Sequence, residues 1–300
     1  MSTTTTLLRV GAVVHPGRPS AARLGKELAA WAAEHDIELR TLDSERGCLG
    51  TDVPCADPAE FPNGLDLVVS LGGDGTLLRA VGLVLAAEVP VLGVNVGRLG
   101  FLTEVEADGL PAALDAVRSG DYQVERRTTL AARVLVEGQQ VAEDLAVNDV
   151  VLEKAPRERL AAVAVRLGDG GPFASYLADG VMVATPTGST AYSFSAGGPI
   201  VSPRLDALLL TPIAPHMVFN RSLVLHPDEG VRLEVLADSP PLVETIDGRV
   251  VRELPPGAVV EVRRGRHDAL LVRLGRADFY RLVRSKFRLA DAAEPPDGDP

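Results

Sequence analysis

The residues best suited to chemistry lie in one glycine-rich stretch in the first third of the chain. The mostly apolar run Leu65–Leu71 leads into Gly72-Gly73-Asp74-Gly75-Thr76, and an amphipathic helical pattern follows. A strand that turns sharply into a helix leaves backbone N–H groups without partners, and glycine removes the Cβ atoms that would hold a bulky anion away from them. The stretch therefore predicts a phosphate-binding loop formed by Gly72, Gly73, Gly75 and Thr76.

Asp74 is the unusual member of this loop, because a carboxylate repels a phosphate unless it has a further task. Two tasks would justify it: taking a proton from an attacking hydroxyl, or holding a metal ion that accompanies the phosphates. From the loop alone, a tight turn without any ligand stays open as a third interpretation.

A second candidate site is the stretch from Asp179 to Pro199, which is rich in hydroxyl side chains and also contains Tyr192. Hydroxyls both donate and accept hydrogen bonds, so they suit the mixed edges of an adenine or a ribose, and a tyrosine ring offers a stacking face. Ser, Thr and Gly enrichment also marks ordinary loops. The hydroxyl residues of this stretch are Thr185, Thr187, Ser189, Thr190, Ser193 and Ser195.

These motifs resemble those of a known family. The run Gly72–Thr76 resembles a signature shared by NAD kinases and by diacylglycerol and sphingosine kinases, and it is similar to a loop in phosphofructokinases. Gly93–Leu102 and Asp179–Pro199 resemble motifs of the NAD kinases alone, as do Val147–Leu152 and Thr211–His216. Because the motifs occur in the family's order, the chain is identified as a member of the NAD kinase family.

The resemblance implies phosphoryl transfer from ATP, or from another donor such as polyphosphate, to the adenosine ribose 2′-hydroxyl of NAD, giving NADP. Asp74 would be the general base. A divalent ion, magnesium or manganese, would accompany ATP, but no spacing of Asp, Glu or His assigns metal ligands. The residues implied to bind NAD are Asp74, Gly75, Arg79, Asn148, Asp149, Arg159, Asp179, Thr187, Thr190, Ala191, Tyr192, Ser193 and Ser195.

Two departures from the family pattern bear on the substrate. Leu177 stands where many members have arginine, which leaves the preference between NAD and NADH open. Arg249 follows Asp247-Gly248 where glutamine is usual. Two rival functions also stay open: a lipid or sugar kinase using the same glycine loop, and a non-catalytic NAD(P)-binding regulator that lacks the transfer chemistry.

The elements that must position these residues divide the chain in two. Apolar runs alternate with helical patterns over residues 1–128, which predicts an α/β domain with a parallel, doubly wound, Rossmann-like sheet, similar to the NAD kinase/diacylglycerol kinase fold. In such a sheet the loop 96–102 should meet the Asp74 loop. Period-two alternation predicts an all-β, dinucleotide-binding domain over residues 129–276, including a strand over residues 269–274. We expect residues 277–290 to pack back on the α/β domain and residues 291–300 to be disordered.

Composition narrows the functional class further. With 41 acidic and 30 basic residues among 300, the net charge of −11 argues against nucleic-acid binding. The sequence shows neither a long apolar run nor a secretory signal pattern, so we expect a cytoplasmic protein without a membrane partner. Its two cysteines show no metal-binding spacing. The family resemblance implies a homodimer or homotetramer.

Overall fold

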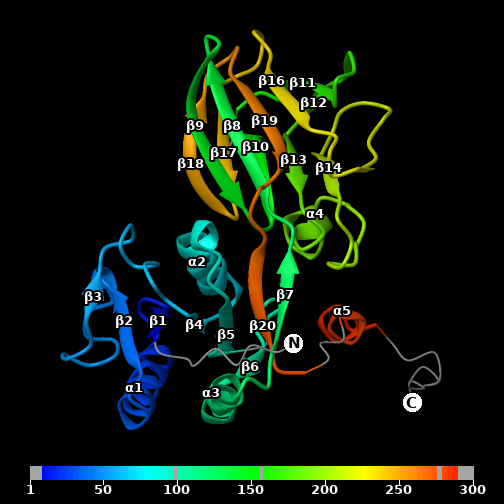
Figure 1. Ribbon diagram of the computed structural model, residues 1–300. Coiled ribbons are helices and arrows are strands. Elements are labelled where there is room, and N and C mark those ends of the chain that lie inside the picture. Colours follow the sequence, from blue (N-terminus) through cyan, green and yellow to red (C-terminus); the bar gives the residue numbers. More distant parts are fainter. Residues whose placement is uncertain (1–8, 98–99, 156–157, 276–278, 290–300) are drawn as a thin grey trace, which may run out of the picture.

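The computed structural model describes residues 9–97, 100–155, 158–275 and 279–289. Figure 1 shows two domains, with a parallel sheet and its helices at the bottom and a β-sandwich at the top. This arrangement confirms the predicted fold class. Among the described residues, no helix combines the length and apolar character needed to cross a membrane.

The first sheet carries the glycine loop. Its strand order is β3-β2-β1-β4-β5-β20-β7, with β6 beside β5, and all neighbours are parallel except the antiparallel pair β20 and β7. The strands are β1 (Arg9–Val14), β2 (Glu38–Leu42), β3 (Cys55–Ala56), β4 (Leu67–Gly72), β5 (Val91–Asn95), β6 (Val105–Glu106), β7 (Gln123–Arg127) and β20 (Ala269–Arg273).

Helices cover both faces of this sheet, which explains why its central strands are almost wholly apolar. Helices α1 (Pro19–Glu34) and α3 (Leu110–Ser119) pack on one face and α2 (Asp74–Val84) on the other. Gly120, in the left-handed conformation with φ +78°, ends α3. Short 3₁₀ turns lie at η1 (Asp43–Glu45), η2 (Leu85–Ala87) and η3 (Ala107–Gly109).

The strand order changes direction at β1, which lies between β2 and β4. In doubly wound folds, ligands bind beyond the carboxyl ends of the strands at such a point. The Asp74 loop follows β4 and therefore lies at this position.

The second domain is a sandwich of two antiparallel, six-stranded sheets packed around one apolar core. The short α4 (Tyr192–Ser195) and η4 (Gly188–Thr190) lie in the hydroxyl-rich stretch. One sheet contains β10 (Asp149–Lys154), β13 (Gly180–Ala184), β14 (Leu208–Ile213), β15 (Leu223–Leu225), β17 (Leu242–Ile246) and β18 (Arg249–Leu254); the other contains β8 (Leu130–Val136), β9 (Gln139–Ala146), β11 (Ala161–Leu167), β12 (Pro172–Ala178), β16 (Val231–Val235) and β19 (Val259–Arg264).

One predicted strand lies in the other domain. The expected all-β unit included residues 269–274, but β20 pairs with β5 and β7 in the first sheet. Ala269, Leu271 and Val272 are buried there between helix-covered faces. The chain thus leaves the α/β domain after β7 and returns to it through β20.

The C-terminal helix α5 (Phe279–Phe287) contacts both domains. The Phe287 ring lies 5.9 Å from that of Phe101, after β5, and 4.3 Å from that of Phe194 in α4. The Phe287 ring thus contacts one residue of each domain. The predicted disordered tail, residues 291–300, lies outside the described residues.

Candidate active site

Asp74 begins α2 and reaches across to the loop that follows β5. Its Oδ2 accepts a hydrogen bond from the Phe101 amide at 2.7 Å, and its Oδ1 accepts from the amides of Leu102 at 3.0 Å and Thr103 at 3.3 Å. The two loops therefore meet as predicted, and three consecutive amides fix the direction of one carboxylate.

The glycines of these loops allow this close approach. A Cβ at Gly100 would lie 1.9 Å from Oδ1 of Asp74, and a Cβ at Gly72 would lie 2.1 Å from Oγ1 of Thr76. Gly73 and Gly75, in contrast, have open space at the Cβ position. The backbone of Gly73 and Gly75 is thus accessible to a ligand, while Thr76 is buried and packs on Gly72.

Arg79, one turn further along α2, is held by the end of β1. Its Nη2 donates to the Val14 carbonyl at 2.7 Å and pairs with Oε1 of the buried Glu45 at 2.5 Å. Oε2 of Glu45 in turn accepts from the Val14 amide at 2.6 Å. The guanidinium of Arg79 is therefore bound by Val14 and Glu45 in this structure, although Arg79 also lines the cleft described next.

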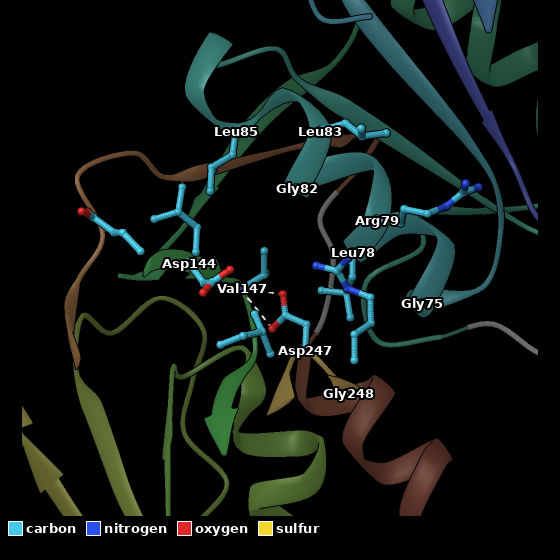
Figure 2. Close-up of a pocket in the computed structure, with 14 residues that line it drawn as sticks. Gly75, Leu78, Arg79, Gly82, Leu83, Leu85, Asp144, Val147, Asp247 and Gly248 are labelled. Carbon is cyan, nitrogen blue, oxygen red and sulfur yellow. Dashed lines mark hydrogen bonds between the residues drawn. The ribbon is translucent and has the colours of Figure 1, made fainter. Parts of the chain in front are cut away.

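A cleft of about 620 Å³ separates α2 from the second domain. Figure 2 shows Gly75 and Arg79 on the side of α2, with the Arg79 side chain extending away from Asp247 and Gly248, which face α2 from the other side. Leu78, Leu83, Leu85 and Leu145 make much of its lining apolar, and Asp144 and Arg249 add charge.

The segment 147–149, which leads into β10, is fixed by the carboxylate of Asp247. Oδ1 of Asp247 accepts from the amides of Asn148 at 2.7 Å, Val147 at 3.1 Å and Asp149 at 3.2 Å, and Oδ2 accepts from Val147 at 2.9 Å. Asp247 thus receives three consecutive amides, as Asp74 does in the first domain.

The carboxyl groups of Asp149 and Asp247 are both buried and lie close enough together to interact. Burial and the nearby Asp247 carboxylate together raise the pKa of Asp149 to about 7. Burial also raises the pKa of Asp247, but the three amides and Arg249 counteract it. Because the amides stabilise the ionised form of Asp247, Asp149 is the member of the pair that holds a proton below about pH 7.

Several predicted dinucleotide residues line one small cavity. Asn148, Asp149, Ala191 and Tyr192 surround about 180 Å³ together with Glu153, Thr245 and the Asp247-Gly248 turn. Tyr192 is 40% exposed, and its hydroxyl donates to Oε2 of Glu153 at 3.2 Å. The stretch thus brings a ring and polar groups together on an accessible surface.

Other hydroxyls of the stretch serve its own folding. Thr187 and Ser193 are buried; Thr187 accepts from Nη1 of Arg127 at 3.3 Å, and Ser193 contacts the Thr211 hydroxyl at 3.4 Å. Thr190 donates to the Thr187 carbonyl at 3.3 Å. Ser195 is exposed at the end of α4.

Asp179 and Arg159 lie outside this cavity's lining. Asp179 is partly exposed, 3.5 Å from Nζ of Lys154. Arg159 is exposed between β10 and β11 and makes no hydrogen bond or ion pair with the other described residues. The structure therefore separates these two residues from the Asn148–Tyr192 group.

Sequence reasoning missed a buried ion network that joins the two halves of the site. Arg273 donates to Oε2 of Glu125 at 2.6 Å, to Oε2 of Glu104 at 2.9 Å and to the Leu102 carbonyl at 3.1 Å. Arg127 shares Glu125 at 2.9 Å and contacts Thr187. The pairing of β20 with β7 brings Arg273 to Glu125 and Arg127, residues far apart in the chain, so no spacing in the sequence could reveal the network.

The described side chains of the candidate active site do not form a metal-binding site by themselves. Within the described ranges, no group of three or more His, Cys, Asp or Glu side chains is arranged to hold a metal ion.

Family comparisons agree with this architecture. Residues 10–122 match the ATP-NAD kinase N-terminal domain and residues 147–274 match the ATP-NAD kinase C-terminal domain. The chain is 41% identical over 279 residues to an NAD kinase of Heliobacterium modesticaldum, covering 93% of this chain and 98% of that one. It is 42% identical over 285 residues to NAD kinase 2 of Streptomyces coelicolor, covering 92% and 93%.

Two solved structures are similar over nearly the whole chain. Yeast NADH kinase complexed with NADH superposes with a TM-score of 0.90 at 25% identity, covering 98% of this chain and 91% of that one. An NAD kinase from Archaeoglobus fulgidus in complex with ATP gives a TM-score of 0.72 at 25% identity, covering 94% and 99%. Together with the two domain matches, these relatives show that the chain belongs to the ATP-NAD kinase family.

Proposed function

We propose that the protein transfers the γ-phosphoryl group of ATP, or of another phosphoryl donor, to the adenosine ribose 2′-hydroxyl of NAD, producing NADP, with Asp74 as the general base. Relatives that share about two fifths of its residues over most of their length are NAD kinases. The observation that carries the assignment of the base is the Asp74 carboxylate, fixed at the start of α2 beside two open glycines.

In this mechanism the ribose hydroxyl attacks the terminal phosphorus of the donor, the bond from phosphorus to the bridging oxygen breaks, and the hydroxyl proton passes to Asp74. The transition state of such a transfer is loose, so the hydroxyl needs little activation and positioning dominates. Three amides hold Asp74 in one orientation. The open backbone of Gly73 and Gly75 suits the phosphates.

The dinucleotide would occupy the accessible surface formed by Asn148, Asp149 and the 190–195 stretch, with Tyr192 packing on a base. Below pH 7, the protonated Asp149 offers a hydrogen-bond donor that an ionised carboxylate lacks. Gly75, Arg79, Arg159 and Asp179 stay predicted contacts, and Arg79 would have to leave Glu45 to reach a ligand.

The remaining features of the reaction are also proposals. A divalent ion, magnesium or manganese, would enter with the donor triphosphate and neutralise part of its charge. The homo-oligomeric state and the cytoplasmic location stay predictions based on the family resemblance and the composition.

The first test is an assay of the purified protein with NAD, ATP and magnesium, in which NADP is detected with an NADP-specific dehydrogenase. Asp74→Asn should lower kcat by about 10²- to 10⁴-fold because the proton acceptor is lost. The dissociation constant for NAD should change far less, since the carboxylate acts mainly in the transition state.

Two results would contradict the proposal in different ways. Turnover by Asp74→Asn within a few-fold of the wild type would show that Asp74 is not the base. NAD binding without NADP formation by the wild type would favour the regulator interpretation. Replacing ATP by polyphosphate, and NAD by NADH, then determines the donor and acceptor preferences.

A further inference from the structure

The backbone of the turn between β17 and β18 directs the carboxylate of Asp247 toward the amides of residues 147–149. Asp247 and Gly248 both have positive φ, at +48° and +75°, which is the type I′ geometry of a two-residue hairpin loop. Asp247 also donates its own amide to the Asp149 carbonyl at 3.1 Å. The turn therefore bonds to the segment 147–149 through both its side chain and its main chain.

The opposite side of this segment packs on the hydroxyl-rich stretch. The Thr185 amide donates to the Asn148 carbonyl at 2.9 Å, and the Thr185 hydroxyl donates to the Val147 carbonyl at 2.6 Å. A Cβ at Gly188 would lie 2.1 Å from the Asn148 carbonyl oxygen, so no side chain fits between them. The backbone of Asn148 is thus held between Gly188 and Asp247.

We propose that Asp247 is a positioning residue for dinucleotide binding: its carboxylate fixes the backbone of residues 147–149, so that the side chains of Asn148 and Asp149 are presented to the NAD cavity. This inference rests on the proposed function and deepens it. Asp247 and Gly248 line both that cavity and the larger cleft facing α2. No other side chain among the described residues receives these three amides.

The contribution of Asp247 arises from its charge. Hydrogen bonds from amides to an ionised acceptor are about twice as strong as neutral ones, and a buried amide left without a partner destabilises the folded segment. Without the carboxylate, the three amides would seek other acceptors and the segment would lose its single orientation. Binding of NAD would then include the cost of ordering it again.

Asp247→Asn is a clean test because it removes the charge without straining the turn. Asparagine tolerates positive φ, and Asn-Gly is itself a favoured type I′ pair. We expect the KM and the dissociation constant for NAD to rise about tenfold or more, while the KM for ATP stays within about twofold. Hydrogen exchange of the peptide containing residues 147–149 should become faster, while exchange in β11 stays unchanged.

Glu137→Gln is the matched control. Glu137 and Gly138 form the turn between β8 and β9 with nearly the same backbone, at φ +51° and +76°, and this turn lies at the opposite end of β9 from Val147. This variant removes a carboxylate from the equivalent turn position and should leave both KM values unchanged.

The outcomes separate this inference from the proposed function. If the wild type forms no NADP, the proposed function fails, and the exchange experiment still tests the positioning role. If the wild type forms NADP but Asp247→Asn keeps the wild-type KM for NAD and the wild-type exchange, the positioning role is wrong. A variant that does not fold, judged by circular dichroism, would assign Asp247 to the fold and overturn the inference as well.

Discussion

Gly100 illustrates at the level of one residue how little room the loop after β5 leaves around Asp74. An alanine Cβ at this position would lie 1.9 Å from Oδ1 and 2.4 Å from Cγ of Asp74, closer than any real contact. The carboxylate would have to move away from the amides of residues 101–103.

We therefore expect Gly100→Ala to lower kcat about 10²-fold or more, because the displaced carboxylate no longer meets the hydroxyl. The rate of NADP formation at saturating substrates measures this. Gly97→Ala, in the same loop, is the matched comparison, since its Cβ would meet only Nη1 of Arg18 at 3.5 Å. Equal losses in the two variants would mean that loop disturbance, and not contact with Asp74, sets the rate.

The sequence indicated the type and position of Asp74 but not what holds it. A glycine turn between an apolar run and a helical pattern is a strong local signal, and the meeting of the two loops follows from a parallel sheet. The partners of Asp74 are backbone amides, which every residue except proline possesses, so no pattern of residue types marks them. The same holds for Asp247, whose partners are also backbone amides.

At the scale of secondary-structure elements, Arg273 connects β20 to the loop that holds Asp74. Its side chain is 7% exposed and bonds to Glu104, Glu125 and the Leu102 carbonyl. Burial opposes ionisation of Glu125, but Arg127 and Arg273 together lower the pKa of this carboxyl below its ordinary value.

Arg273→Met should lower the free energy of unfolding by about 3 kcal/mol, because it leaves Glu104 and Glu125 poorly compensated. Urea denaturation followed by circular dichroism measures this. Arg232→Met is the control: Arg232 pairs with Glu261, but its side chain is 42% exposed, so we expect a loss of less than about 1 kcal/mol. Similar losses for both variants would show that the Arg273 network adds nothing beyond a surface ion pair.

Individual strands and turns were easier to predict than the strands with which they pair. Alternation along residues 269–274 correctly indicated a strand, but alternation is a property of one strand and does not say which sheet it joins. The distinction depends on contacts more than a hundred residues apart in sequence, such as Arg273 with Glu125. Hairpin turns such as 168–171, between β11 and β12, and 247–248, between β17 and β18, have glycine-containing sequences that indicate a turn locally.

At the scale of the whole molecule, two buried carboxyl groups make stability depend on pH. The pKa of Asp149 is raised to about 7. Burial also raises the pKa of Glu244 to about 7, although Arg252 at 3.0 Å partly offsets it. Both pKa values exceed those of an unfolded chain, so the folded state retains protons that the unfolded state has lost.

The stabilising contribution of these two groups is fully present below about pH 4 and is lost as the pH rises to about 7. Asp149→Asn and Glu244→Gln should each remove part of this dependence. Between pH 5 and pH 8, the free energy of unfolding of each variant should rise by on the order of 2 kcal/mol relative to that of the wild type. Urea midpoints at the two pH values measure the difference. If the free energy of unfolding of a variant changes with pH in the same way as that of the wild type, the replaced carboxyl group titrates normally.

The position of β20 has a consequence for the synthesis of the protein. In order of translation, β5 and β7 are complete by residue 127, but the strand that lies between them ends at residue 273. While the β-sandwich emerges from the ribosome, the nascent α/β domain therefore exposes the part of the β5 edge that β6 leaves unpaired, and its sheet cannot close. Closing the sheet joins segments far apart in sequence, which is a slow step in folding. The sandwich can fold first, and the enzyme acquires its finished glycine-loop sheet only when nearly the whole chain has been made.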